Sequence, residues 1–78
     1  MSDTVEVRLD RVLKGVKAEA SYHPDSDVRK DLALDSLDVM MLLFEIEKEF
    51  ALKIPEEDLD TQGLLVLGRM AEYIRSRG

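Results

Sequence analysis

The first chemistry that this sequence could support is cation binding by a group of aspartates. Asp25, Asp27 and Asp31 occupy the first, third and seventh positions of a possible calcium loop. Such a loop needs a glycine at its sixth position for a sharp turn and a bidentate glutamate at its twelfth. Lys30 and Ser36 stand at those two positions instead. We therefore expect no calcium site, and no metal site of any other kind.

The second candidate chemistry is nucleophilic catalysis by Ser36. His23 is the only histidine of the chain, and it directly precedes Pro24. A serine–histidine pair would need a third group that orients the histidine and a set of donors for an oxyanion, and the sequence suggests neither. The chain also has no cysteine that could join His23 in a zinc site. We interpret His23 as a loop residue and expect that the protein is not an enzyme by itself.

Ser36 stands where a helix is predicted to begin. Asp35 is a good N-cap, and Asp38 three residues later gives a shortened capping box. The apolar spacing predicts a helix from Ser36 to Phe50. The segment after it cannot continue the helix, because Pro55 disfavours helical geometry at the residue before it. Ser36 is therefore either an ordinary helix-capping serine or a hydroxyl that projects outward from a loop-to-helix junction.

Three other segments are predicted to be helical. The first covers residues 4–17 and can be capped by Thr4 or Asp3. A short helix should start with Pro55 as its first residue, because three acids follow it. The last helix should cover roughly Leu64 to Arg75, with Gly68 as a weak point. The apolar stripes of the first and last helices are Val5, Leu9, Val12, Leu13 and Val16, and Leu67, Met70, Ala71 and Ile74.

Residues 18–34 show no sustained period and predict a long connecting loop. Val28, Leu32 and Leu34 are its expected anchors on the core. Loops of this length are uncommon in compact domains and usually have a function. The predicted fold is all-α: a small antiparallel four-helix bundle of three longer helices and one short helix, with a long loop between the first and second helices. We expect residues 1–78 to form a single domain.

The helix from Ser36 to Phe50 is apolar on two sides. One side should face the core and carries Val39, Leu42, Leu43, Ile46 and Phe50. Leu37, Met41 and Phe44 cluster on nearly the opposite side, and Met40 lies between the two groups. Three other helices are too few to bury both sides, so we predict that Leu37, Met41 and Phe44 form a strip that docks a partner. The alternative is that the long loop covers part of the strip, Leu37 first.

Composition and charge exclude several functions. No apolar run approaches the roughly 18 residues of a membrane span, and the N-terminus lacks the pattern of a signal peptide. The net charge is −6, and residues 31–60 hold ten acids against two bases. Such a field repels nucleic acid and anionic lipid and attracts basic protein surfaces, or simply keeps the protein soluble. We expect a soluble, cytoplasmic monomer that binds neither nucleic acid nor membrane.

The run Asp31-Leu32-Ala33-Leu34-Asp35-Ser36-Leu37-Asp38 resembles the Asp-Ser-Leu signature of acyl carrier proteins from dissociated fatty-acid and polyketide synthases. The tripeptide alone is a weak signal. Its setting is more specific, because it heads the second helix of a chain of carrier-protein length. Glu47-Lys48-Glu49-Phe50 and Ile54-Pro55-Glu56-Glu57 follow it, and later Ala71-Glu72-Tyr73-Ile74. The resemblance covers the whole chain.

This resemblance implies a cofactor and partners. In such carriers the signature serine bears 4′-phosphopantetheine through a phosphodiester, and the thiol of that arm holds an acyl group as a thioester. Carried over to this chain, the attachment site is Ser36, and a phosphopantetheinyl transferase would modify it. A helix N-terminus favours an attached phosphate through its unpaired N–H groups and positive dipole. The arm supplies its own thiol, so a chain without cysteine can carry thioesters.

The resemblance also implies docking of acyl-transfer and synthase enzymes through basic patches. The acids that could steer such partners are Asp35, Asp38, Glu45, Glu47, Glu49, Glu56 and Glu57. Each exposed ion pair contributes only about 0–1 kcal/mol, so together they would mainly set encounter and orientation.

Several positions depart from fatty-acid carriers. Met41 and Lys48 stand where acids are common, and Ala33-Leu34 where Gly-Ala is common. These departures favour a polyketide or other specialised acyl pathway at least as much as housekeeping fatty-acid synthesis. The alternatives are an aminoacyl or peptidyl carrier, and a helical protein-interaction module without a prosthetic group.

Overall fold

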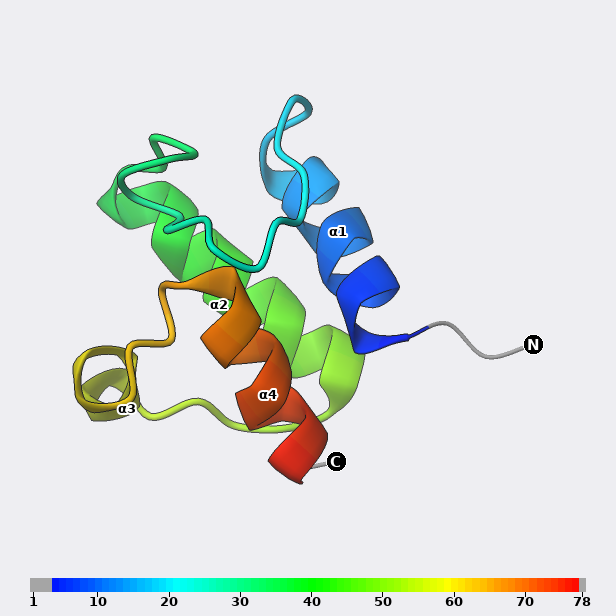
Figure 1. Ribbon diagram of the computed structural model, residues 1–78, viewed down its shortest axis with the longest axis vertical. Helices are drawn as coiled ribbons and strands as arrows, with labels where there is room; N and C mark the ends of the chain where they lie inside the picture. Colours follow the sequence, from blue (N-terminus) through cyan, green and yellow to red (C-terminus); the bar gives the residue numbers. More distant parts are fainter. Residues whose placement is uncertain (1–3, 78) are drawn as a thin grey trace.

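The computed structural model describes residues 4–77, which form four helices around one apolar core (Figure 1). In the view of Figure 1, α1 runs up the page, whereas α2 and α4 run down it. The long loop between α1 and α2 passes across the top of α4. This arrangement confirms the predicted all-α bundle with three longer helices and one short one. The helices are α1 (Val5–Val16), α2 (Ser36–Phe50), α3 (Glu56–Thr61) and α4 (Leu67–Arg77).

The core lies where the apolar stripes of α1, α2 and α4 meet. The predicted stripe of α4 is buried throughout, and Leu9 and Leu13 of α1 are fully buried. In the loop, Val28 and Leu34 are buried, as predicted for anchors, and Leu32 is half-buried. From α2 the buried side chains are Val39, Leu42 and Ile46, with Leu43 and Phe50 packed half-buried against them.

Side-chain caps fix the starts of α1 and α2. Thr4 Oγ1 accepts a hydrogen bond from the N–H of Val7 at 3.2 Å. The alternative cap, Asp3, lies outside the described residues. Asp35 Oδ1 accepts from the N–H of Asp38 at 2.8 Å, which is the predicted cap of α2. These local signals are why the predicted starts of both helices agree with the structure.

The helix α2 ends through its own backbone rather than through Pro55. Ala51 adopts the left-handed conformation, with φ 53° and ψ 47°. The N–H groups of Ala51 and Leu52 both donate to the carbonyl of Glu47. This satisfies a carbonyl that the helix end would otherwise leave unpaired. Pro55 was predicted to be the first residue of the short helix. It is instead the N-cap of α3, whose first residue is Glu56.

The prediction that α4 begins at Leu64 is wrong, because α4 begins at Leu67. The long loop competes for the backbone before it. The N–H of Val28 donates to the carbonyl of Leu65 at 3.0 Å, and the N–H of Leu67 donates to the carbonyl of Ser26 at 2.9 Å. These bonds flank an isolated antiparallel bridge between Asp27 and Val66, and residues 62–65 form a turn before it. At its other end α4 continues to Arg77, two residues beyond the predicted end.

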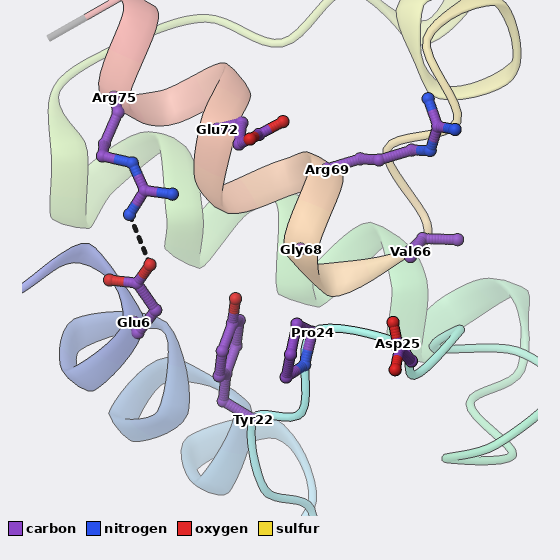
Figure 2. Close-up of a pocket in the computed structure, with 9 residues that line it drawn as sticks. All are labelled: Glu6, Tyr22, Pro24, Asp25, Val66, Gly68, Arg69, Glu72 and Arg75. Atoms are coloured by element: carbon purple, nitrogen blue, oxygen red, sulfur yellow. Dashed lines mark hydrogen bonds and ion pairs between the residues drawn. The ribbon is translucent and has the colours of Figure 1, made fainter.

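Gly68 lets the loop approach the first turn of α4. Its N–H donates to the carbonyl of Pro24 at 2.9 Å. A Cβ at this position would lie 2.7 Å from the Pro24 carbonyl oxygen and 3.3 Å from its Cα. Figure 2 shows the two residues facing each other. Both line a groove with a volume of about 480 Å³. Gly68 is therefore needed for the close packing of the loop against α4. The sequence alone showed only that a glycine weakens a helix.

Polar contacts tie α1 to its two neighbouring long helices. Arg8 of α1 donates to the Glu49 carboxylate at 2.8 Å and to the Glu49 carbonyl at 2.6 Å. Arg75 of α4 pairs with Glu6 of α1 across the groove in Figure 2. These bonds connect α1 with α2 and α1 with α4. Within residues 4–77, no helix is long and apolar enough to cross a membrane.

Candidate functional site

Ser36 is exposed as the first residue of α2. Asp35 performs the capping, because its carboxylate takes the N–H of Asp38 and its carbonyl takes that of Val39. The N–H groups of Ser36 and Leu37 are left without an intrahelical acceptor. Within the described residues the Ser36 hydroxyl makes no hydrogen bond. Of the two interpretations of Ser36, the structure therefore excludes the helix-capping serine.

The backbone that leads into Ser36 is held by its own hydrogen bonds. The Asp27 carboxylate accepts from the N–H of Arg29 at 2.8 Å and from that of Lys30 at 3.1 Å. The N–H of Leu34 donates to the carbonyl of Val28 at 3.0 Å. Buried Val28 and Leu34 fasten this turn to the core. The approach to Ser36 is thus a fixed turn.

Ala33 takes a left-handed conformation with φ 57° within that turn. An alanine pays a steric penalty there that a glycine would not. This position is one of the two where the sequence departs from the Gly-Ala of fatty-acid carriers.

Ser36 opens onto an apolar pocket between α2 and α3. The pocket has a volume of about 380 Å³. Two of its walls are Leu43 of α2 and Leu59 of α3, both half-buried, and Ile54 closes it from the connecting segment. Side chains of this kind can shelter a hydrocarbon chain, at roughly 0.8 kcal/mol for each methylene taken from water. The lining residues are Arg29, Ser36, Val39, Met40, Leu43, Phe44, Glu47, Ile54, Glu56 and Leu59.

A partly buried hydrogen bond fixes the α3 wall of this pocket. Tyr73 of α4 is buried and donates its hydroxyl to Asp58 of α3 at 2.9 Å. Burial, and then this bond, raise the pKa of Tyr73, so the phenol remains a donor at neutral pH. The Arg77 guanidinium lies over the Tyr73 ring, 4.6 Å from its centre, and 3.9 Å from the Asp58 carboxylate. Asp58 thereby anchors a short helix that has no buried residue of its own.

The apolar strip of Leu37, Met41 and Phe44 is exposed. The exposed fractions of these side chains are 66%, 46% and 63%, and that of Met40 is 54%. The long loop does not cover Leu37, so the alternative to an open strip is wrong. Met40 and Phe44 also line the apolar pocket, so the strip and the pocket are continuous. The docking role of the strip stays a prediction.

The predicted docking acids are not equivalent in the structure. Glu47 Oε2 accepts from the N–H of Ile54 at 2.8 Å, and Glu49 is engaged by Arg8. Asp38 is half-buried. Each of these three acids is therefore either bonded within the fold or partly buried, and their docking role stays a prediction. The exposed candidates are Asp35, whose carboxylate also caps α2, and Glu45, Glu56 and Glu57.

Arg29 is a neighbour of Ser36 that the sequence reasoning did not single out. Its side chain is exposed and lines the same pocket as Ser36. The available signal was the basic pair Arg29-Lys30, which stands directly before a segment with ten acids and two bases. Its meaning depended on the loop returning to the head of α2, which a sequence pattern does not give.

The residues around Ser36 fit a phosphate-linked arm. An accessible hydroxyl without a hydrogen bond can be esterified, unpaired N–H groups and the helix dipole favour an anion there, and an arginine shares the pocket. The apolar walls suit a hydrocarbon cargo.

Comparison with known proteins shows the family to which this chain belongs. Residues 8–74 match the family model described as "Phosphopantetheine attachment site". The mitochondrial acyl carrier protein of Saccharomyces cerevisiae is 44% identical over 80 residues, which cover 95% of this chain and 62% of that protein. The acyl carrier protein of Bdellovibrio bacteriovorus is 40% identical over 63 residues, which cover 81% and 70%.

A plant relative shows the same likeness over a shorter span. The mitochondrial acyl carrier protein 3 of Arabidopsis thaliana is 47% identical over 51 residues, which cover 65% of this chain and 37% of that protein. The chain thus spans less than two thirds of the length of the two mitochondrial relatives. No solved structure matches it. The chain belongs to the acyl carrier protein family, whose members are non-catalytic carriers with a phosphopantetheine prosthetic group.

Proposed function

We propose that Ser36 carries the 4′-phosphopantetheine arm and that the protein transports acyl groups on it. The arm contributes a thiol that binds the acyl group as a thioester. The observation that supports this best is the exposed, unbonded Ser36 hydroxyl at the head of α2, beside an apolar pocket of about 380 Å³. The hydroxyl is accessible to a phosphopantetheinyl transferase.

The chain's own residues orient and shelter the cargo. The N–H groups of Ser36 and Leu37 and the positive end of α2 face the phosphate position. Leu43, Ile54 and Leu59 offer an apolar surface away from water. A carrier of amino acids or peptides would have less use for such walls, so the pocket favours an acyl cargo.

We assign partner docking to the open strip on α2 and the acids around it. Burying a Phe44 or Met41 side chain in a complex is worth roughly 1.5–3 kcal/mol, against at most about 1 kcal/mol for an exposed ion pair. The acids would guide basic enzyme surfaces, and the strip would supply much of the affinity. A docking face with exposed Met41 and Lys48 in place of acids supports partners of a specialised acyl pathway.

Two further expectations remain proposals. Residues 1–78 are proposed to act as one carrier domain. A cytoplasmic location stays a proposal as well, because the named relatives include both mitochondrial and bacterial acyl carrier proteins and so point to different locations.

Intact mass after co-expression with a phosphopantetheinyl transferase tests the attachment site. The unaltered chain and a Ser26→Ala control should each gain about 340 Da, the mass of the arm. Ser36→Ala should gain nothing. It should also melt close to the unaltered chain, because Asp35 and not Ser36 caps α2. A Ser36→Ala protein that still gains the mass, or a folded chain that never gains it, would overturn the proposal.

A further inference from the structure

We propose that Arg29 is a positioning residue for the phosphate of the arm. Its guanidinium neutralises the phosphodiester on Ser36 and directs the start of the arm toward the pocket between α2 and α3. This inference rests on the proposed attachment at Ser36.

Arg29 shares the pocket with Ser36 and has no competing partner. Among the residues that line the pocket, Arg29 is the only base, and Glu47 and Glu56 are acids. Within residues 4–77, its guanidinium forms no hydrogen bond or ion pair. A guanidinium that is accessible, unpaired and on the wall of the pocket that Ser36 also lines is available to an anion.

The backbone of Arg29 is held while its side chain is free. Its N–H donates to the Asp27 carboxylate at 2.8 Å, and the preceding residue, Val28, is 1% exposed. The N–H of Val28 is fixed in turn by the carbonyl of Leu65. Because this backbone is already fixed, Arg29 loses little backbone entropy when its guanidinium binds an anion, which makes the contact more favourable.

The negative charges around Ser36 are a reason for the Arg29 guanidinium to bind the phosphate. A phosphodiester on Ser36 would carry one negative charge between the carboxylates of Asp35 and Asp38, in a segment with ten acids and two bases. The partial positive charge of a helix end is about half an elementary charge and does not offset two neighbouring carboxylates. Arginine binds phosphate oxygens in a bidentate, charge-assisted geometry.

Lys30 provides a matched control. It is the next residue, it is also exposed, and its N–H donates to the same Asp27 carboxylate. It does not line the pocket with Ser36. Arg29→Gln and Lys30→Gln therefore change net charge equally and differ in their relation to Ser36.

The test is the ³¹P NMR shift of the phosphodiester in the holo protein, after intact mass confirms that the arm is attached. Each protein is also measured in urea, which gives the shift of the unrestrained diester. We expect the folded holo protein and Lys30→Gln to differ from the urea value in the same way. Arg29→Gln should lose most of that difference, and Arg29→Lys should recover part of it. Raising sodium chloride should move the unaltered protein toward the urea value, because salt screens the contact.

The outcomes separate this inference from the proposed function. If the arm attaches but Arg29→Gln keeps the shift of the unaltered protein, the role of Arg29 is wrong and the carrier function stands. If no arm attaches to the unaltered chain, the proposed function itself fails. Should Arg29→Gln not fold or not be modified, the salt titration of the unaltered holo protein decides, and a shift indifferent to salt overturns the inference.

Discussion

Replacing Gly68 with alanine should destabilise the protein, although alanine is the better helix former. The new Cβ would meet the Pro24 carbonyl oxygen at 2.7 Å, and Pro24 Cβ and Cα at 3.2 and 3.3 Å. Two of these three contacts are with backbone, so no flexible side chain can move aside. The loop or the first turn of α4 must shift, and the shift strains the hydrogen bond from the Gly68 N–H to Pro24.

The magnitude follows from three opposing contributions. Overpacking costs about 1–3 kcal/mol, and a weakened hydrogen bond up to about 0.5–1.5 kcal/mol. The gain in helix propensity offsets at most about 1 kcal/mol. The net loss is therefore about 0.5–3.5 kcal/mol, which lowers the melting temperature of a domain of this size by roughly 2–28 °C.

Gly15→Ala is the matched control. A Cβ at Gly15 meets nothing within 4 Å, and the residue is exposed near the end of α1. Only propensity acts there, so this variant should gain up to about 1 kcal/mol. Thermal and urea unfolding by circular dichroism measure both. If Gly68→Ala is as stable as the unaltered chain, the steric account of the loop contact is refuted.

Three further predictions concern the surface and its charges. Met41→Glu should weaken binding to the native partner, and because Met41 is 46% exposed the melting temperature should hardly change; a large drop in melting temperature would place Met41 in the core. The hydrogen bond from Lys14 and then that from the Tyr22 N–H lower the pKa of Asp10 from its ordinary 3.8. The unaltered chain should therefore be more stable than Asp10→Asn at neutral pH, and this difference in unfolding free energy should shrink as the pH falls below about 4. A gap that is constant in urea titrations across that range would contradict this. Salt or millimolar divalent cations should raise the melting temperature by screening the acidic segment; indifference to both would mean that pairs such as Arg8–Glu49 and Arg77–Asp58 already neutralise it.

Local signals made α1 and α2 predictable. Thr4 and Asp35 cap their helices through bonds to residues three positions on, which a sequence pattern contains. The two-sided apolar pattern of α2 predicted the exposed strip for the same reason. Spacing along one helix decides which side chains share a face.

Features that depend on distant segments were not predictable. The start of α4 is set by bonds from Val28 and to Ser26, some forty residues earlier in the chain. Gly68 looked like a helix-weakening residue because its contact with Pro24 exists only in the folded chain. The pocket beside Ser36 and the place of Arg29 in it likewise arise only when α3 and the long loop pack against α2.

The central claim is that this chain holds acyl groups as thioesters on an arm at Ser36. The most direct measurement is mass spectrometry of the protein purified from its own cells, before and after neutral hydroxylamine, with the modified peptide sequenced. We predict an acyl mass above that of the holo form, its loss with hydroxylamine, and an arm of about 340 Da that remains on the peptide containing Ser36. An adduct that resists hydroxylamine, or an arm on a peptide without Ser36, would contradict the account.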